Sequence, residues 1–189
     1  MRTAPKYIVG VGASAGGLIS FKDLLDYLPS NTGMAFVFAA HILPDATSYL
    51  ADILSRHTKM STTIAASGME IRANQVYVST PNTDILIENY KFRVITPRIK
   101  RNVLLDNLLT SLAESMGAGA IGIVLSGYGA DGTAGCKQIK EKRGITFAQD
   151  SSAEVGQMPR SAQAAGFIDF VLSPCKISEE LARIAKASR

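Results

Sequence analysis

The sequence has few of the residues that bind zinc or form disulfide bonds. Its 189 residues include two cysteines, Cys136 and Cys175, and two histidines, His41 and His57. The cysteines lie far apart and lack the spacing of metal ligands, so a zinc site made of Cys and His is excluded. We therefore expect no bound metal, and we expect both thiols to be reduced and buried.

Long apolar runs are also absent. The longest uncharged stretch, residues 115–130, is too short to span a bilayer and contains five glycines. The first residues do not show the charged, apolar and small-residue segments of a secretory leader. With 47% apolar and 19% charged residues, the composition is that of an ordinary globular protein. These features predict a single cytoplasmic domain over residues 1–189, with no insertion into a membrane.

A strong charge imbalance is missing as well. The net charge is +4, and the densest basic run is residues 91–101. Such a run is usually a solvated surface; the alternative is an electrostatic patch for an acidic partner. No aromatic-rich stretch accompanies it, which argues against nucleic acid as a partner. The basic residues of this run are Lys91, Arg93, Arg98, Lys100 and Arg101.

Short apolar and β-branched runs alternate with segments of helical periodicity along most of the chain. This alternation predicts an α/β fold, with a doubly wound, mostly parallel sheet flanked by helices. A peripheral β-hairpin is expected from residues 85–87 and 92–95. Strands are expected at residues 7–11, 35–40, 76–78, 120–125, 145–148 and 167–172. Helices are expected at residues 18–28, around 49–54, and at 104–116, 134–142, 159–165 and 178–187, the last capped by Ser178.

The most informative stretch is the bend that follows the first strand. Gly12-Ala13-Ser14-Ala15-Gly16 fits the G-x-S-x-G pattern, in which flanking glycines let a strained turn expose a nucleophilic serine. A glycine-rich loop before a helix can instead hold a phosphate, as in dinucleotide-binding proteins. The dinucleotide fingerprint requires Gly where this chain has Ala15, and no acidic residue follows strand 35–40 to bind a ribose. This stretch alone leaves three hypotheses open: a nucleophile, a phosphate loop from Gly10 to Gly17, and a plain tight turn.

A nucleophilic serine needs a base, and the two histidines are the candidates. His57 lies late in a predicted helix among basic residues, which favours a surface or helix-capping role. His41 follows a buried strand and is expected at the same edge of the sheet as Ser14. A carboxylate must orient the imidazole, and Asp131 is best placed because it follows strand 120–125 in a glycine-rich loop. The alternative for Asp131 is a cap on the next helix. The other acidic candidates are Asp45, Asp52, Asp150 and Asp169.

Several motifs, in this order along the chain, resemble the catalytic domain of CheB, the chemotaxis protein-glutamate methylesterase. They are residues 12–17, the histidine at a strand end followed by Pro44, residues 125–132, and Met158-Pro159-Arg160-Ser161-Ala162. The resemblance covers nearly the whole chain and is strongest to the form that is fused to a receptor methyltransferase. It implies a Ser14 nucleophile, a His41 base and an orienting Asp131 carboxylate, with backbone N–H groups such as that of Ala15 holding the oxyanion.

The resemblance also implies an activity. The expected reaction is hydrolysis of γ-glutamyl methyl esters on the cytoplasmic helices of chemoreceptors, with deamidation of glutamine as a second activity. No metal or organic cofactor is implied, and the implied partners are methyl-accepting chemoreceptor helices and a CheR-type methyltransferase. The receiver domain of the chemotaxis enzymes is not expected here, so control by phosphorylation is not implied. The alternatives are an inactive CheB-like scaffold and a dinucleotide-binding protein that uses the loop from Gly10 to Gly17.

Three positions depart from the family pattern. Tyr128 replaces a non-aromatic residue, Gln157 replaces a glycine, and Leu104-Leu105-Asp106 replaces Pro-Ile-Asp. Because Tyr128 lies three residues before Asp131, its ring is expected to narrow the space above Ser14. The alternative is that its hydroxyl donates a hydrogen bond to the substrate or the oxyanion.

Overall fold

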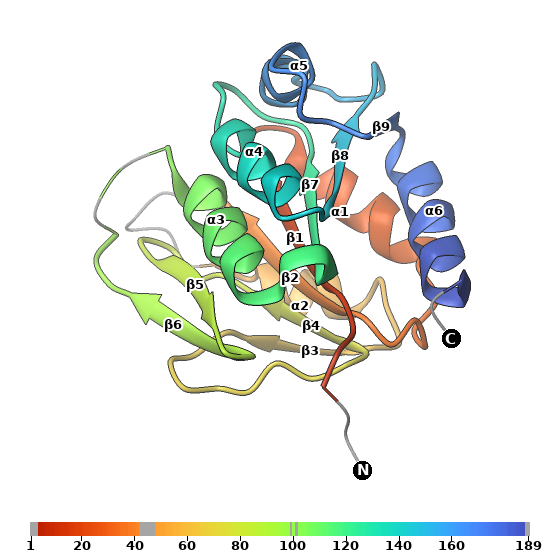
Figure 1. The fold of residues 1–189 in the computed structure, drawn as a ribbon. Helices are drawn as coiled ribbons and strands as arrows, with labels where there is room; N and C mark the ends of the chain where they lie inside the picture. Colours follow the sequence, from red (N-terminus) through yellow and green to blue (C-terminus); the bar gives the residue numbers. More distant parts are fainter. Residues whose placement is uncertain (1–3, 42–47, 99, 101, 188–189) are drawn as a thin grey trace.

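The computed structural model describes residues 4–41, 48–98, 100 and 102–187. In these residues a parallel sheet lies between two layers of helices, and a small hairpin packs at one side (Figure 1). The predicted fold class is therefore confirmed. Asp45, Pro44 and Arg101 lie outside the described residues.

The central sheet has seven strands in the order β3-β4-β2-β1-β7-β8-β9. All its neighbouring strands are parallel, so their carboxyl ends share one edge, at the top of Figure 1. The strands are β1 (Ile8–Ala13), β2 (Ala35–Ala40), β3 (Ser61–Ile64), β4 (Gln75–Val78), β7 (Ala120–Val124), β8 (Ile145–Gln149) and β9 (Phe170–Leu172). Strand β3 was not predicted, because this partly exposed edge strand is mostly polar and carries no apolar pattern.

The two faces of the sheet are covered by different helices. On one face lie α1 (Gly17–Asp26), α2 (Leu50–Ser55) and α6 (Pro174–Ala187); on the other lie α3 (Leu104–Met116), α4 (Thr133–Glu141) and α5 (Gln157–Ala164), with a short 3₁₀ turn at Gly117–Gly119. Alternate residues of β1 serve the two layers: Val9 and Val11 join the α1 and α6 core, and Ile8 joins the α3 and α4 core. Burial on both faces explains why the central strands β1, β2 and β7 are continuously apolar.

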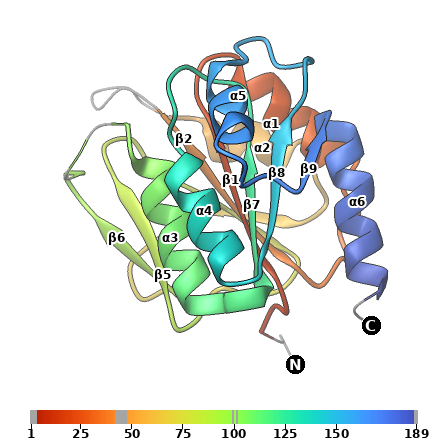
Figure 2. The ribbon, with the colours of Figure 1, turned by 45° about the horizontal axis from the view of Figure 1, so that its top comes forward.

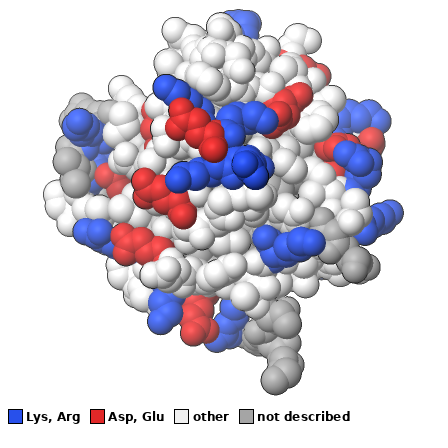
Figure 3. Space-filling model, in the orientation of Figure 1, with Lys and Arg blue, Asp and Glu red and all other residues white. Residues whose placement is uncertain are grey.

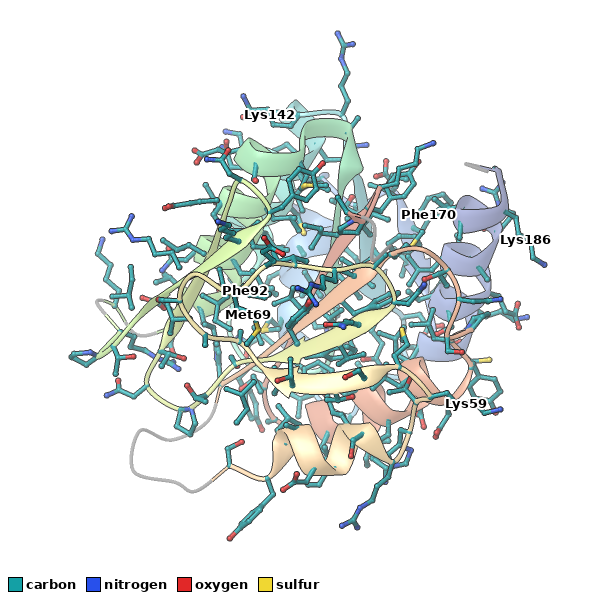
Figure 4. The ribbon with its side chains drawn as sticks, turned by 90° about the horizontal axis from the view of Figure 1, so that it is seen from below. Lys59, Met69, Phe92, Lys142, Phe170 and Lys186 are labelled. Atoms are coloured by element: carbon teal, nitrogen blue, oxygen red, sulfur yellow. The ribbon has the colours of Figure 1, made fainter. Side chains whose placement is uncertain are left out.

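The hairpin β5 (Asp84–Glu88) and β6 (Lys91–Ile95) is antiparallel, as predicted. Ser111 of α3 accepts a hydrogen bond from the backbone N–H of Ile87 at 3.0 Å, which ties the hairpin to the helix layer. Phe92 lies beside Met69 in the view from below (Figure 4), and the backbone N–H of Phe92 donates to the Met69 carbonyl. The ring of Phe92 also packs edge-on against Tyr77, with 4.8 Å between ring centroids.

Several predicted boundaries are wrong. Strand β1 continues through Gly12 to Ala13, whereas the prediction ended it at residue 11. Helix α6 begins at Pro174, so Ser178 is an interior residue; its hydroxyl donates to the carbonyls of Leu24 and Pro174 instead of capping the helix. Strand β9 begins three residues later than predicted. Both thiols are free, but only Cys136 is buried, since Cys175 is partly exposed.

Candidate active site

Ser14, His41 and Ser126 follow three adjacent strands at the carboxyl edge of the sheet. Strand β1 lies between β2 and β7, and Ala13 stands opposite Ala40 in the register. The backbone N–H of Ser14 donates to the Ser126 carbonyl at 2.9 Å, and that of His41 donates to the Ala13 carbonyl at 3.2 Å. This edge comes forward in Figure 2. The parallel sheet therefore brings the predicted nucleophile and base together.

The bend at Ser14 differs from the strained turn that the sequence pattern suggested. Ser14 does not have a positive φ. The residue of this bend that takes the left-handed conformation is Gly16, with φ 71°. The Ser14 carbonyl accepts a hydrogen bond from the N–H of Gly17 at 3.0 Å, which closes the turn into α1. Glycine takes the left-handed conformation without steric cost, so the bend does not require it of the serine.

Ala15 is held by its carbonyl, leaving its N–H available. The carbonyl accepts a hydrogen bond from the Ser126 hydroxyl at 2.7 Å. Within the described part of the chain, the Ala15 N–H donates to no acceptor. A backbone N–H at the start of a helix is a suitable donor for a developing oxyanion.

His41, at the strand end next to Ser14, forms a close side-chain pair with Asp131. The His41 Nε2 lies 2.6 Å from the Asp131 Oδ2, and the carboxylate is almost fully buried. This contact assigns the proton to Nε2 when the imidazole is neutral, which leaves Nδ1 as the acceptor. In the residues that the structure describes, no hydrogen bond joins the Ser14 hydroxyl to His41. Catalytic contacts of this kind are often long without substrate.

The Asp131 carboxylate is fixed by the first turn of α3. It accepts hydrogen bonds from the backbone N–H groups of Leu105 at 2.9 Å and Asp106 at 2.8 Å. Burial would raise the pKa of Asp131, but the hydrogen bonds from His41, Leu105 and Asp106 outweigh it and lower the pKa below the ordinary value. Asp131 is therefore held as an anion. The capping alternative is realised on α3 and not on the helix that follows Asp131.

Asp106 interacts with both helices at this point. Its Oδ1 accepts a hydrogen bond from the N–H of Gly135 in α4 at 2.8 Å. Burial, and then the charge of Asp131, raise the pKa of Asp106 above its ordinary value, and the Gly135 N–H only partly opposes this.

The other candidates have separate roles in the structure. His57 Nδ1 lies 2.8 Å from Asp26 on the surface, beyond the end of α2. Asp169 accepts hydrogen bonds from Lys140 and Thr146, and Asp150 accepts one from the backbone of Ser152. Asp52 lies in the first turn of α2. Of the carboxylates weighed from the sequence and described here, Asp131 is the one paired with His41.

Two polar residues at this edge were missed in the sequence. Ser126 is fully buried; besides holding Ala15, its hydroxyl accepts the N–H of Val155 at 3.0 Å. Gln149 is the last residue of β8, and its Oε1 accepts hydrogen bonds from the Ser20 hydroxyl and the Ser126 N–H. Their position at the carboxyl ends of two predicted strands is the signal that would have found them.

The phosphate-loop hypothesis is not supported by the packing. Gly10 and Gly12 lie inside β1, where an added Cβ would meet Leu109 of α3 at 2.7 Å and Leu105 at 2.1 Å. Their small size therefore accommodates helix α3, whereas a dinucleotide fingerprint needs such glycines in a loop against phosphate. Among the described residues there is no cluster of three His, Cys, Asp or Glu that would hold a metal ion.

A parallel α/β domain that sets a serine at a strand-to-helix bend, next to a strand end whose histidine pairs with a buried aspartate, has the architecture of a serine hydrolase. More specifically, the chain belongs to the CheB methylesterase family, whose sequence profile matches residues 9–181. The predicted family is thus confirmed. No helix in the described residues has the length and apolar character needed to cross a bilayer.

Individual relatives and a solved structure agree with this assignment. A protein of Leptospira interrogans is 34% identical over 178 residues, which cover 92% of each chain. A Geobacter sulfurreducens protein, named protein-glutamate methylesterase/protein-glutamine glutaminase 1, is 28% identical over 187 residues; the match covers 94% of this chain and 52% of that protein. The crystal structure of the Thermotoga maritima CheB methylesterase catalytic domain gives a TM-score of 0.85 at 28% identity, covering 96% of this chain and 100% of that one.

Proposed function

We propose that this protein hydrolyses methyl esters of glutamate side chains on chemoreceptors, giving glutamate and methanol, and that it also deamidates glutamine at such sites. The observation that carries the proposal is the 2.6 Å contact between His41 Nε2 and Asp131 Oδ2 at the strand end next to Ser14. The names of the relatives support the substrate, because the Geobacter protein is named for both reactions.

In the proposed mechanism His41 acts through Nδ1. Because Asp131 occupies Nε2, the Nδ1 of neutral His41 takes the proton of the Ser14 hydroxyl as Ser14 attacks the ester carbonyl. His41 then donates this proton to the departing methoxide, which leaves as methanol. Water, deprotonated by His41, cleaves the acyl-enzyme to release glutamate and restore Ser14. The Asp131 anion stabilises the imidazolium in both halves of the reaction.

Backbone donors at the bend stabilise the tetrahedral intermediate. The N–H of Ala15 has no acceptor among the described residues, and it stands at the start of α1 beside Ser14. A single donor of this kind is worth about 3–4 kcal/mol of transition-state stabilisation. The mechanism uses protein groups and water at every step, so no metal or organic cofactor enters it.

The partners follow from the reaction. The substrate ester must be made by a methyltransferase that acts on the same glutamates, and a CheR-type enzyme has that activity. Receptor helices that carry several glutamates are acidic, which suits the basic side chains of the hairpin and the segment after it. The proposed place of action is the cytoplasm, where those helices lie.

The decisive experiment measures methanol release from a methylated receptor cytoplasmic fragment by the wild type and by Ser14→Ala. We expect the wild type to release methanol and Ser14→Ala to be slower by about 10³-fold or more. His57→Ala is the matched histidine control and should retain wild-type turnover. An inactive scaffold would release no methanol above the uncatalysed rate, and that result would refute the proposed function.

A further inference from the structure

Tyr128 presents an exposed aromatic ring at the rim of the candidate active site. Tyr128 is 66% exposed, although it directly follows the buried Gly127. The preceding residue, Gly127, lies against the nucleophile, since a Cβ added there would come within 2.9 Å of the Ser14 Cβ. Tyr128 is therefore one residue away from the wall that touches Ser14, and its ring does not belong to the core.

The loop that carries Tyr128 is anchored on both sides of this residue, by α5 and by Val155 just before α5. The N–H of Gly127 donates to the Val155 carbonyl, and the Gly127 carbonyl accepts from the N–H of Met158, both at 2.8 Å. On the other side of Tyr128, Gly129 donates its N–H to the Gln157 Oε1 at 3.2 Å. These contacts fix the backbone immediately before and after the exposed ring.

A second side chain of α5 completes the anchor at Gly129. The Ser161 hydroxyl donates a shared hydrogen bond to the Gly129 carbonyl at 3.1 Å and to the Gln157 carbonyl at 2.9 Å. Both backbone polar groups of Gly129 are thus engaged by α5 side chains. Gly129 has φ 84°, and a Cβ added there would meet nothing within 4 Å, so no side-chain packing would hold a residue at this position. Gln157 and Ser161 supply that restraint.

We propose that Tyr128 is a specificity-determining contact for the protein substrate, and that Gln157 and Ser161 are positioning residues that hold it in place. The inference rests on the proposed function, and it identifies Tyr128 as the residue by which the enzyme distinguishes a protein ester from a small ester. An exposed aromatic ring on an anchored backbone gives a large contact area at little entropic cost on binding. A receptor helix docked with one side chain at Ser14 extends over the rim and covers the ring, whereas a small ester bound at Ser14 does not reach it.

The ring is tested with Tyr128→Ala and Tyr128→Phe, using a methylated receptor fragment and p-nitrophenyl acetate as substrates. Tyr128→Ala should raise KM for the receptor fragment about fivefold or more and leave hydrolysis of the small ester unchanged. Tyr128→Phe keeps the ring and should behave as the wild type on both. Faster hydrolysis of both esters by Tyr128→Ala would show an obstruction, and a kcat loss in Tyr128→Phe would show a hydroxyl donor; either result overturns the proposal.

The anchor is tested with the double variant Gln157→Met and Ser161→Ala. It should raise KM for the receptor fragment about threefold, the loss expected for exposed hydrogen bonds, without changing kcat on the small ester. Gln157→Glu keeps the acceptor for the Gly129 N–H and should have the wild-type KM for the receptor fragment. Gln138→Met on α4 is the matched control. In a Tyr128→Ala background the double variant should cause no further rise in KM for the receptor fragment.

Two results separate the possible failures. An undiminished effect of the double variant in the Tyr128→Ala background would overturn the positioning role, because the α5 side chains would then act independently of the ring. A wild type that hydrolyses p-nitrophenyl acetate but releases no methanol from the receptor fragment would contradict the proposed function itself.

Discussion

Asp131 caps the helix that contains Asp106, and Asp106 in turn caps the helix that follows Asp131. The carboxylate of Asp131 accepts the N–H groups of Leu105 and Asp106 at the start of α3, and that of Asp106 accepts the N–H of Gly135 in α4. The N–H groups of both helix N-termini favour the ionised carboxylates, and for Asp131 this outweighs burial, whereas for Asp106 burial outweighs it. The reciprocal arrangement sets the position of the carboxylate that His41 uses.

Asp131→Asn should disable the enzyme without unfolding it. An amide in place of the carboxylate no longer accepts the Nε2–H with an anionic oxygen, so His41 loses its tautomer preference and its stabilised imidazolium. We expect kcat to fall about 10³- to 10⁴-fold in a methanol-release assay. Asp26→Asn removes the carboxylate from the other His–Asp pair, on the surface, and should leave kcat unchanged. Equal losses in the two variants would contradict the assigned role of Asp131.

Asp106→Asn should preserve or raise stability at neutral pH. The pKa of Asp106 is raised in the folded protein, so its ionised form is disfavoured by folding above that pKa. The amide can still accept the Gly135 N–H but carries no charge beside Asp131. The advantage of the variant should shrink as pH falls through the folded pKa of Asp106 toward its unfolded value. Melting temperature measured against pH, for wild type and variant, tests this.

Asp131 gives the opposite sign in the same measurement. Its folded pKa is lowered, so the ionised group stabilises the fold above the unfolded pKa, and this contribution is lost as pH falls through the folded pKa. Asp131→Asn should therefore melt lower than the wild type at pH 7, with a difference that shrinks in acid. If the two variants showed the same pH trend, the charge arrangement described for this pair would be wrong.

The basic run should influence the protein substrate through long-range charge. On the face seen in Figure 3, positive and negative side chains alternate, and Arg93 is paired with Glu88 at 3.1 Å. Of the other described basic residues of the run, Lys91 and Lys100 are exposed and Arg98 is half-buried, so steering falls mainly to the two lysines. Added salt should lower kcat/KM on the receptor fragment and change hydrolysis of a neutral small ester little.

A charge-matched control tests whether the basic run itself causes the salt dependence. Replacing Lys91 and Lys100 by glutamine should reduce the salt dependence, whereas the same change at Lys142 and Lys186, which lie at the ends of α4 and α6 (Figure 4), should not. Equal salt sensitivity of both substrates in the wild type would identify the run as ordinary solvated surface.

The sequence predicted the bounds of helices and strands best where an element is buried and its positions must therefore be apolar. Strand β2 and helix α3 have the predicted bounds, because continuous apolar runs and leucine periodicity have a single interpretation. Strand β3 was missed because an exposed edge strand has no such pattern. The glycine at position 12 was assigned to the turn, but it remains in β1 because Leu105 fills the space where its side chain would be.

The candidate active site was likewise predictable only in part. Ser14, His41 and Asp131 follow predicted strands, so a parallel sheet brings them to one edge. The anchoring of Asp131 on α3, and of the Tyr128 loop on α5, depends on side-chain and backbone contacts between segments more than 20 residues apart. Such contacts follow from the packing of helices on the sheet, and a local pattern in the sequence does not encode them.

The most direct test of the account is the turnover of the Ser14→Ala and His41→Ala double variant on a methylated receptor fragment. Each single variant should lose about 10³-fold or more in kcat, since the serine and its base act as one unit. The double variant should then be scarcely slower than either single variant. If the two losses multiplied, Ser14 and His41 would contribute independently, and the shared mechanism would be contradicted.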